Sequence, residues 1–187
     1  MRVIQASPKA DSMRKVRVTS TMLKYVSTLC LFLPIGIFIS VILFPEWLDQ
    51  IVAQQFSHLR IDSGISGMKR ALLLLLITFP LGLAVFGLWQ IRSLFSAFSH
   101  GEIFSVKTAT YIHRTGIVIL LSPILNIVFG AISSVLLTYD NPTGSRQLAI
   151  SMSSDAIGLV IIGGLLIVIG WTMREAAGLQ EENKQFV

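Results

Sequence analysis

Charged residues are scarce in this sequence. They make up 13% of the 187 residues, whereas hydrophobic residues make up 53%. Soluble domains usually carry about 25% charged residues, so this chain has too little charge to cover a water-soluble surface. Cys30 is the only cysteine, which excludes an internal disulfide and any metal site built on cysteine pairs. We therefore expect a membrane protein, and the cysteine content leaves its redox compartment open.

Motifs of common catalytic and nucleotide-binding sites are also missing. The sequence has no Ser-His-Asp order, no H-E-x-x-H, no P-loop and no dinucleotide fingerprint. The histidines, His58, His100 and His113, lack the spacing of a metal pair. His100 and His113 share one connection, so a pH-sensing role stays open beside the simpler interpretation as interface residues. We expect no enzyme activity, no catalytic residue, no metal and no cofactor.

Four long apolar stretches are the main positive feature of the sequence. They cover residues 22–44, 71–91, 116–137 and 156–173. Each is close to the roughly 20 residues that a helix needs to cross a bilayer core about 30 Å thick. The sequence predicts an all-α, integral membrane four-helix bundle over residues 22–173. A basic tail, residues 1–21, precedes it, and a helical tail, residues 174–187, follows it.

The longest connection, residues 45–70, contains a different helical pattern. Apolar residues recur at helical spacing from Leu48 to Leu59. This spacing predicts a short amphipathic helix lying in the membrane interface, in the first outer loop. The sequence SGISG at residues 63–67 is expected to end that helix.

The basic residues predict the orientation in the membrane. Eleven of the fifteen Lys and Arg residues fall in the N-terminal tail and its boundary, the second connection and the C-terminal tail. Since positively charged segments stay in the cytoplasm, we expect both termini to be cytoplasmic and the protein to lie in the cell membrane. The net charge of +5 is then explained by contact with the lipid bilayer, and we expect no direct binding of nucleic acid.

Small residues form a narrow stripe on the fourth apolar stretch and beyond it. They recur every seventh position, at Ala156, Gly163, Gly170 and Ala177. Small residues let helix backbones approach closely in lipid. The stripe is a candidate helix-packing seam, either within the bundle or between the two copies of a homodimer.

Proline and polar residues inside the spans raise the possibility of transport. Pro34, Pro80 and Pro123 each remove a backbone hydrogen bond, and transporters use broken helices to build midplane sites. A polar path would pass Asn126, Ser122 and Thr78. The alternative is that the prolines are ordinary features of membrane helices and that Asn126 forms hydrogen bonds between helices.

Two stretches, Phe95–Gly116 and Met173–Val187, resemble a bacterial family of small four-span membrane proteins, domain of unknown function 2975. The first, Phe95–Gly116, is similar to the family's signature, in which a short helix ends in Gly-Glu-x-Phe-Ser/Thr and a basic turn precedes a glycine. The second, Met173–Val187, is similar to its closing Arg-Glu-x-x-x-Leu-x-Glu-Glu-Asn run. The chain departs from the family at Ala176, where glycine is common, and at residues 185–186. The matching residues are Gly101, Glu102, Phe104, Ser105, Arg114, Gly116, Arg174, Glu175, Leu179, Glu181, Glu182 and Asn183.

The resemblance implies a function, because family members are often encoded beside a small helix-turn-helix regulator. It implies that the protein is the membrane partner of a cytoplasmic DNA-binding protein. Candidate partner-binding residues are Gly101, Glu102, Phe104, Ser105, Arg174, Glu175, Leu179, Glu181, Glu182 and Asn183. Two alternatives stay open: a small transporter or channel subunit, and a membrane-stress or lipid-responsive sensor that uses the Leu48–Leu59 helix.

Overall fold

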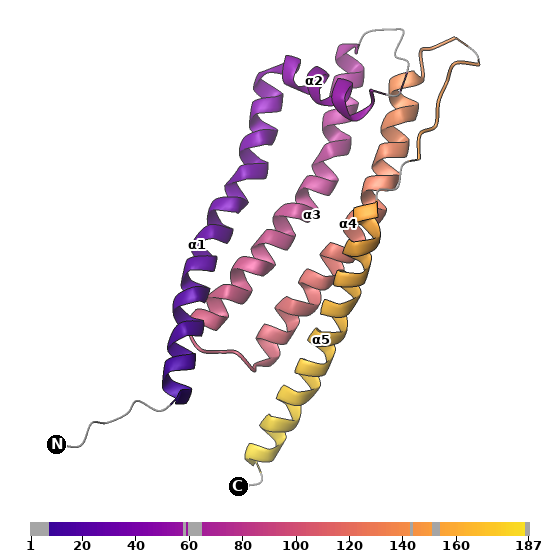
Figure 1. Ribbon diagram of the computed structural model, residues 1–187. Helices are drawn as coiled ribbons and strands as arrows, with labels where there is room; N and C mark the ends of the chain where they lie inside the picture. The colour runs from indigo at the N-terminus through magenta and orange to yellow at the C-terminus, as the bar shows by residue number, and fades with distance from the viewer. Residues whose placement is uncertain (1–7, 58, 60–64, 143, 151–153, 186–187) are drawn as a thin grey trace, which may run out of the picture.

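The computed structural model describes residues 8–57, 59, 65–142, 144–150 and 154–185, with side chains described from residue 14 to residue 179 of these ranges. These residues form five helices and no strand (Figure 1). The helices are α1 (Pro8–Leu43), α2 (Pro45–Gln55), α3 (Gly67–Ser99), α4 (Val106–Thr138) and α5 (Ser154–Gln185). All except α2 are long and apolar enough to cross a membrane. The prediction of an all-α protein is therefore confirmed, and four of its helices are long and apolar enough to span a membrane, as predicted.

The four long helices pack side by side as a single row, in the order α1, α3, α4, α5 (Figure 1). α3 contacts α1 on one side and α4 on the other, and α5 packs on α4. This arrangement differs from a closed four-helix bundle, because α1 and α5 lie at opposite edges of the row. Lipid tails are as apolar as these side chains, so no hydrophobic force drives the row to close on itself.

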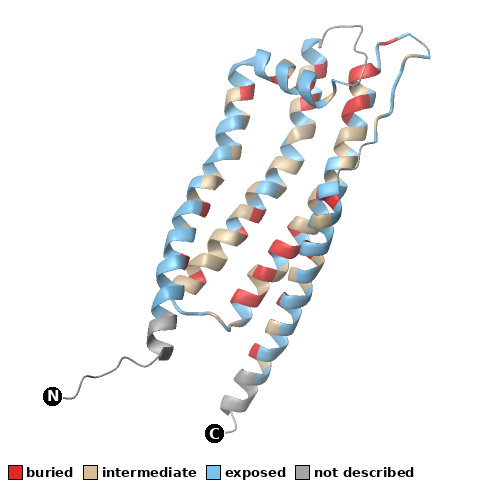
Figure 2. Cartoon of the chain, in the orientation of Figure 1, coloured by how far each residue is buried: buried red, intermediate tan, exposed pale blue. Residues whose placement is uncertain are grey.

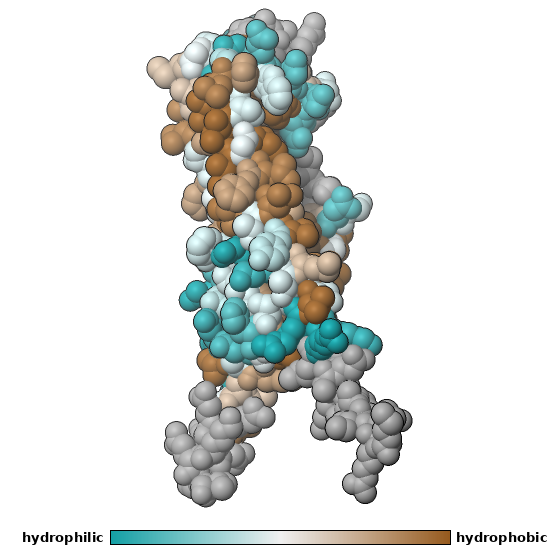
Figure 3. All heavy atoms as spheres, turned by 90° about the vertical axis from the view of Figure 1, so that its left-hand side faces the viewer, coloured by the Kyte–Doolittle hydropathy of each residue, from teal (hydrophilic) through white to brown (hydrophobic). Residues whose placement is uncertain are grey.

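The surface of the row is apolar over most of its length. Buried residues are few and lie along the contacts between helices (Figure 2), whereas large side chains such as Leu29, Phe32 and Ile161 are exposed. The α1 edge has a broad hydrophobic zone over its upper half, and hydrophilic residues gather toward the end that holds the termini (Figure 3). An exposed surface of this extent belongs in lipid.

α2 crosses the end of the row that lies away from the termini (Figure 1). Pro45 occupies its first turn, where a missing N–H costs nothing. Leu48 and Val52, one turn apart, are buried in a cluster with Val41, Leu73 and Leu137. A helix is thus present where the amphipathic pattern predicted one, although it ends at Gln55 rather than at Leu59. Residues 63 and 64 of the expected stop lie outside the described residues.

The connection between α4 and α5 descends along α4, so that α5 begins beside the middle of α4 (Figure 1). Two buried hydroxyls of α4 bond to the backbone of this extended segment. Ser134 Oγ accepts from Ala149 N at 3.0 Å, and Thr138 Oγ1 accepts from Gln147 N at 3.1 Å. These bonds satisfy backbone groups that would otherwise have no partner in an apolar surrounding.

The prolines considered as a sign of transport lie inside continuous helices. Pro34, Pro80 and Pro123 are within α1, α3 and α4, and each helix continues on both sides of its proline. The described residues therefore contain no broken helix of the kind that transporters use at midplane sites.

Candidate functional site

The connection between α3 and α4 is a short, tightly bonded turn at the end of the row that holds both termini. Gly101 takes a positive φ of 85°, a conformation that glycine adopts without strain, and so ends α3. Ser105 caps α4, because its Oγ accepts from Thr108 N at 3.2 Å. Thr108 Oγ1 donates to the Glu102 carbonyl at 2.6 Å. Gly101 and Ser105 therefore set the end of α3 and the start of α4.

This turn holds two of the predicted partner-binding side chains at the surface. Glu102 is exposed, and Phe104 is 75% exposed, among the largest exposed fractions of any hydrophobic residue described here. Phe104 lies in the turn between Ser99, where α3 ends, and Val106, where α4 begins. The turn therefore presents an apolar ring next to a carboxylate.

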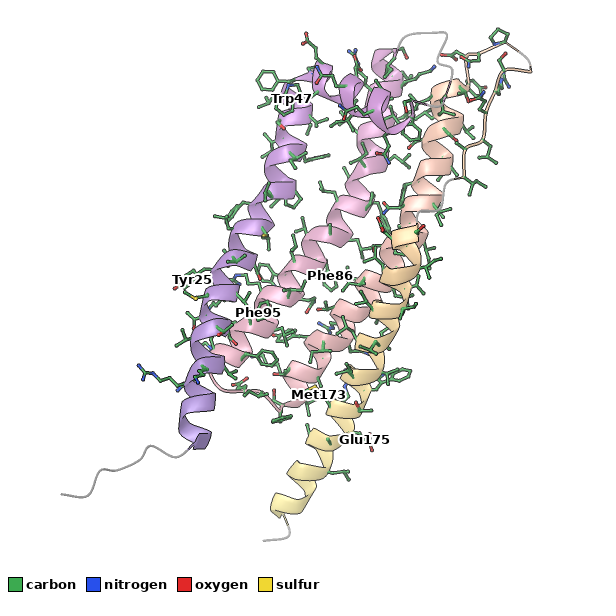
Figure 4. All side chains as sticks on the ribbon, viewed as in Figure 1. Tyr25, Trp47, Phe86, Phe95, Met173 and Glu175 are labelled. Carbon is green, nitrogen blue, oxygen red and sulfur yellow. The ribbon has the colours of Figure 1, made fainter. Side chains whose placement is uncertain are left out.

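The last turns of α5 lie beside the first turns of α4. Arg174 Nη2 donates to Thr110 Oγ1 at 3.1 Å, and Ala177 is buried. Met173 and Glu175 lie low on α5, close to the level where α4 begins (Figure 4). Leu179 is 55% exposed on the same terminal stretch. The structure thus brings together the two stretches of family resemblance; the side chains of Glu181, Glu182 and Asn183 lie outside the described residues.

A polar hollow of about 330 Å³ adjoins the turn. Its lining includes Arg92, Ser93, Ser96, His100, Glu102, Lys107 and Tyr111. His100 Nδ1 lies 2.7 Å from the Ser96 carbonyl oxygen, which only accepts, so this nitrogen carries the proton. Arg92 of α3 and Lys107 of α4 thus line the same hollow as the Glu102 carboxylate.

α1 adds positive charge to the same end of the row. Arg17 Nε donates to the Ser99 carbonyl at 3.3 Å. Arg92 of α3 donates to Thr28 Oγ1 of α1 at 3.0 Å, and its guanidinium lies 5.7 Å from the centre of the Trp89 ring. Arg17 of α1 and Arg92 of α3 therefore add positive charge to the same end of the row.

The four residues of the candidate packing seam face α4. Ala156, Gly163, Gly170 and Ala177 are all buried. A Cβ built on Gly170 would come 2.8 Å from His113 Cα, and one built on Gly163 would come 2.6 Å from Leu120 N. Opposite Gly163 lies Gly116, the last residue of the first family-like stretch, which makes that glycine a packing residue rather than a ligand-binding one.

The polar residues considered for a transport path lie mostly on the outside of the row. Asn126 and Thr78 are exposed, and Ser122 is half-buried. Ser122 Oγ donates to the carbonyl of Ile119 and Thr78 Oγ1 to that of Leu75, each within its own helix. Among the described residues, no group of three or more His, Cys, Asp or Glu side chains could hold a metal ion.

A second hollow lies between α3 and α4. Arg114 of the family-like stretch lies on the exposed face of α4, and it lines a groove together with Gln90 of α3. Sequence reasoning missed Gln90, which is 3% exposed. Its only signal was one amide side chain near the polar end of an otherwise apolar run.

Comparison with known proteins gives one result. A family model described as "Protein of unknown function (DUF2975)" matches residues 9–187, which is nearly the whole chain. No curated protein and no solved structure matches the chain.

Proposed function

The chain belongs to this family, whose description assigns no activity, and we propose that it is a membrane-anchored docking protein for a cytoplasmic DNA-binding regulator. The observation that carries the proposal is the exposure of Phe104 and Leu179 at one end of the row. The turn and the α5 tail lie side by side there, joined by the Arg174–Thr110 hydrogen bond. Large apolar side chains that stand beyond the membrane-spanning part are typical anchors of protein interfaces.

Carboxylates near these two side chains are available to a basic partner. Glu102 and Glu175 are exposed beside Phe104 and Leu179. The sequence adds Glu181 and Glu182 on the following turn of the tail. Carboxylates at the rim of an interface steer a positively charged protein into register, while the apolar anchors supply affinity. A small helix-turn-helix protein carries such a basic surface for its contact with DNA phosphates.

The proposal places the docking end in the cytoplasm and the protein in the cell membrane. The clustering of Arg17, Lys24, Arg92, Lys107 and Arg114 at this end supports that orientation. α2 would then lie at the opposite membrane surface. Its exposed Trp47 pairs with Phe44, with ring centres 6.3 Å apart, as amphipathic rings do in a headgroup region.

Replacing the two apolar anchors tests the proposal. The tagged protein with Phe104→Ser and Leu179→Ser, extracted in mild detergent, is expected to lose a DNA-binding protein that co-purifies with the unchanged chain. Leu148→Ser is the matched control, because Leu148 is 64% exposed but lies on the α4–α5 connection at the other end. Equal retention of the regulator by the two variants would refute docking at this end.

The alternatives from the sequence gain less support. A transporter needs a lined path, and the exposed positions of Asn126 and Thr78 provide none. Liposomes containing the protein should therefore hold solute gradients, and Asn126→Leu should change nothing. A lipid-responsive sensor remains compatible with docking, since a sensor also needs an output.

A further inference from the structure

A groove runs between α3 and α4 on one face of the row, separate from the docking end. It encloses about 490 Å³ and is lined by Gly82, Val85, Phe86, Trp89, Gln90 and Arg114. From Gly82 to Gln90 the groove follows α3 for about 12 Å, at 1.5 Å per residue. One leaflet of a bilayer core is roughly 15 Å deep. The groove is therefore nearly as long as one leaflet is deep.

The chemistry of the groove changes along its length. Gly82, Val85 and Phe86 form the part nearer the middle of the membrane, and they are wholly apolar; Phe86 lies on α3 beside α4 (Figure 4). Trp89, Gln90 and Arg114 form the part nearer the termini. At Gly82 nothing lies within 4 Å of where a Cβ would stand, so this section is open. An elongated molecule with an apolar and a polar end would match both parts.

Gln90 supplies a polar atom that lacks a partner. The residue is 3% exposed, and its Oε1 is buried without a hydrogen bond. A buried acceptor without a hydrogen bond destabilises the folded protein, and native proteins contain few such atoms. Since Gln90 lines the groove, a donor from a molecule bound there would satisfy this atom.

Arg114 supplies a positive charge at the same level. Val118, one turn further along α4, packs against Gly87 of α3, where an added Cβ would stand 2.7 Å from Val118 Cγ1. Because the two helices run in opposite directions, Arg114 lies beside the Trp89–Gln90 turn. Arg114 is exposed, and among the described residues it has no ion-pair or hydrogen-bond partner. A guanidinium free in this position fits a phosphate oxygen.

We propose that this groove binds one anionic phospholipid from the leaflet on the side of the termini. The lipid phosphate lies on the Arg114 guanidinium, a hydroxyl of the headgroup donates to Gln90 Oε1, and an acyl chain lies along Gly82, Val85 and Phe86. Trp89 stands at headgroup level, where its indole N–H can donate to the lipid ester. A free inorganic anion would use Arg114 but would leave the apolar half of the groove empty.

Native mass spectrometry of the full chain tests the assignment, with phosphatidylglycerol and phosphatidylcholine as competing lipids. The unchanged protein is expected to retain one phosphatidylglycerol in preference to phosphatidylcholine. Arg114→Gln should lower that retention about tenfold, the factor expected for loss of one charge-assisted hydrogen bond. Lys107→Gln is the matched control, because it removes the same charge from the first turn of α4, outside the groove.

Gly82→Leu provides a second variant that keeps the assignment falsifiable. The open space at Gly82 lets the side chain enter the groove without displacing protein atoms, so the helix should stay folded while lipid retention falls. Three results would overturn the proposal: no preference for phosphatidylglycerol, equal loss in Arg114→Gln and Lys107→Gln, or displacement of the lipid by inorganic phosphate alone. The regulator assay with Phe104 and Leu179 does not depend on any of them.

Discussion

Gly163 of α5 and Gly116 of α4 let the two helices meet backbone to backbone. A Cβ on Gly163 would stand 2.9 Å from the Gly116 carbonyl oxygen, and one on Gly116 would stand 2.8 Å from the Gly163 carbonyl oxygen. Neither oxygen belongs to a flexible side chain, so an added methyl group would push the helices apart. In the row, α5 lies at the edge and packs on α4, which makes this contact decisive for its position.

Gly163→Ala is therefore expected to destabilise the protein by about 1–3 kcal/mol, the usual cost of overpacking. Gly164→Ala is the control, since nothing lies within 4 Å of its Cβ position. That substitution should stabilise α5 slightly, by up to about 1 kcal/mol, because alanine is the better helix former. Thermal unfolding midpoints in one detergent give the comparison; equal shifts for the two variants would contradict the close contact.

The buried Lys69 depends on Asp140. Its Nζ lies 2.9 Å from Asp140 Oδ2 and 3.4 Å from the Leu137 carbonyl, and its side chain is 7% exposed. Asp140→Ala should cost about 1–3 kcal/mol, because it leaves a buried ammonium with one carbonyl partner. Asp140 itself is 51% exposed, so solvent screening keeps the cost below that of a fully buried pair.

Adding Lys69→Met to Asp140→Ala should recover part of the lost unfolding temperature, since it removes the orphaned charge. Asp49→Ala is the control for a partly exposed pair: Asp49 Oδ1 accepts from Arg70 Nε at 3.2 Å, with both side chains over a third exposed. Its cost should be at most about 1 kcal/mol. A double variant less stable than Asp140→Ala alone would rule out this role of Asp140.

Ser134 and Thr138 hold the extended segment against α4. Both are fully buried, and their hydroxyls accept from Ala149 N and Gln147 N. Ser134→Ala and Thr138→Val should each expose these amides and raise their rates of hydrogen exchange. Ser122→Ala is the control, because its hydroxyl bonds only within its own helix. Unchanged exchange at residues 147 and 149 would show that the segment is held by other contacts.

The orientation can be measured with two exposed glutamates at opposite ends, Glu46 and Glu102. In a chain with Cys30→Ser, Glu46→Cys should react with a membrane-impermeant maleimide on intact cells. Glu102→Cys should react only after the membrane is opened. The reverse pattern would place the docking turn outside the cell and exclude a cytoplasmic partner.

Local chemistry made much of this fold predictable. Long apolar runs specify helices because backbone groups have no other partners in lipid. Gly101 and Ser105 act within a few residues of their own helix ends, so the α3–α4 turn could be anticipated in detail. The Leu48 pattern likewise predicted α2, although the helix stops one turn earlier than expected.

The arrangement of the helices was not predictable in the same way. The faces of α1 and α3 are apolar nearly all round, so their sequences contain no stripe that distinguishes a row from a closed bundle. The course of the descending segment along α4 was not predictable, because the bonds from Ser134 and Thr138 depend on tertiary contact. Gln90 was not predicted for the same reason. It lines a groove together with Arg114, which is 24 positions away in the sequence.

A photo-crosslinking amino acid placed at residue 104 in living cells tests the central claim most directly. The account predicts a cross-linked product with a DNA-binding regulator from position 104, and none from position 148 at the other end of the row. Products containing only lipid or a second copy of this chain at position 104 would contradict docking of a regulator at this turn.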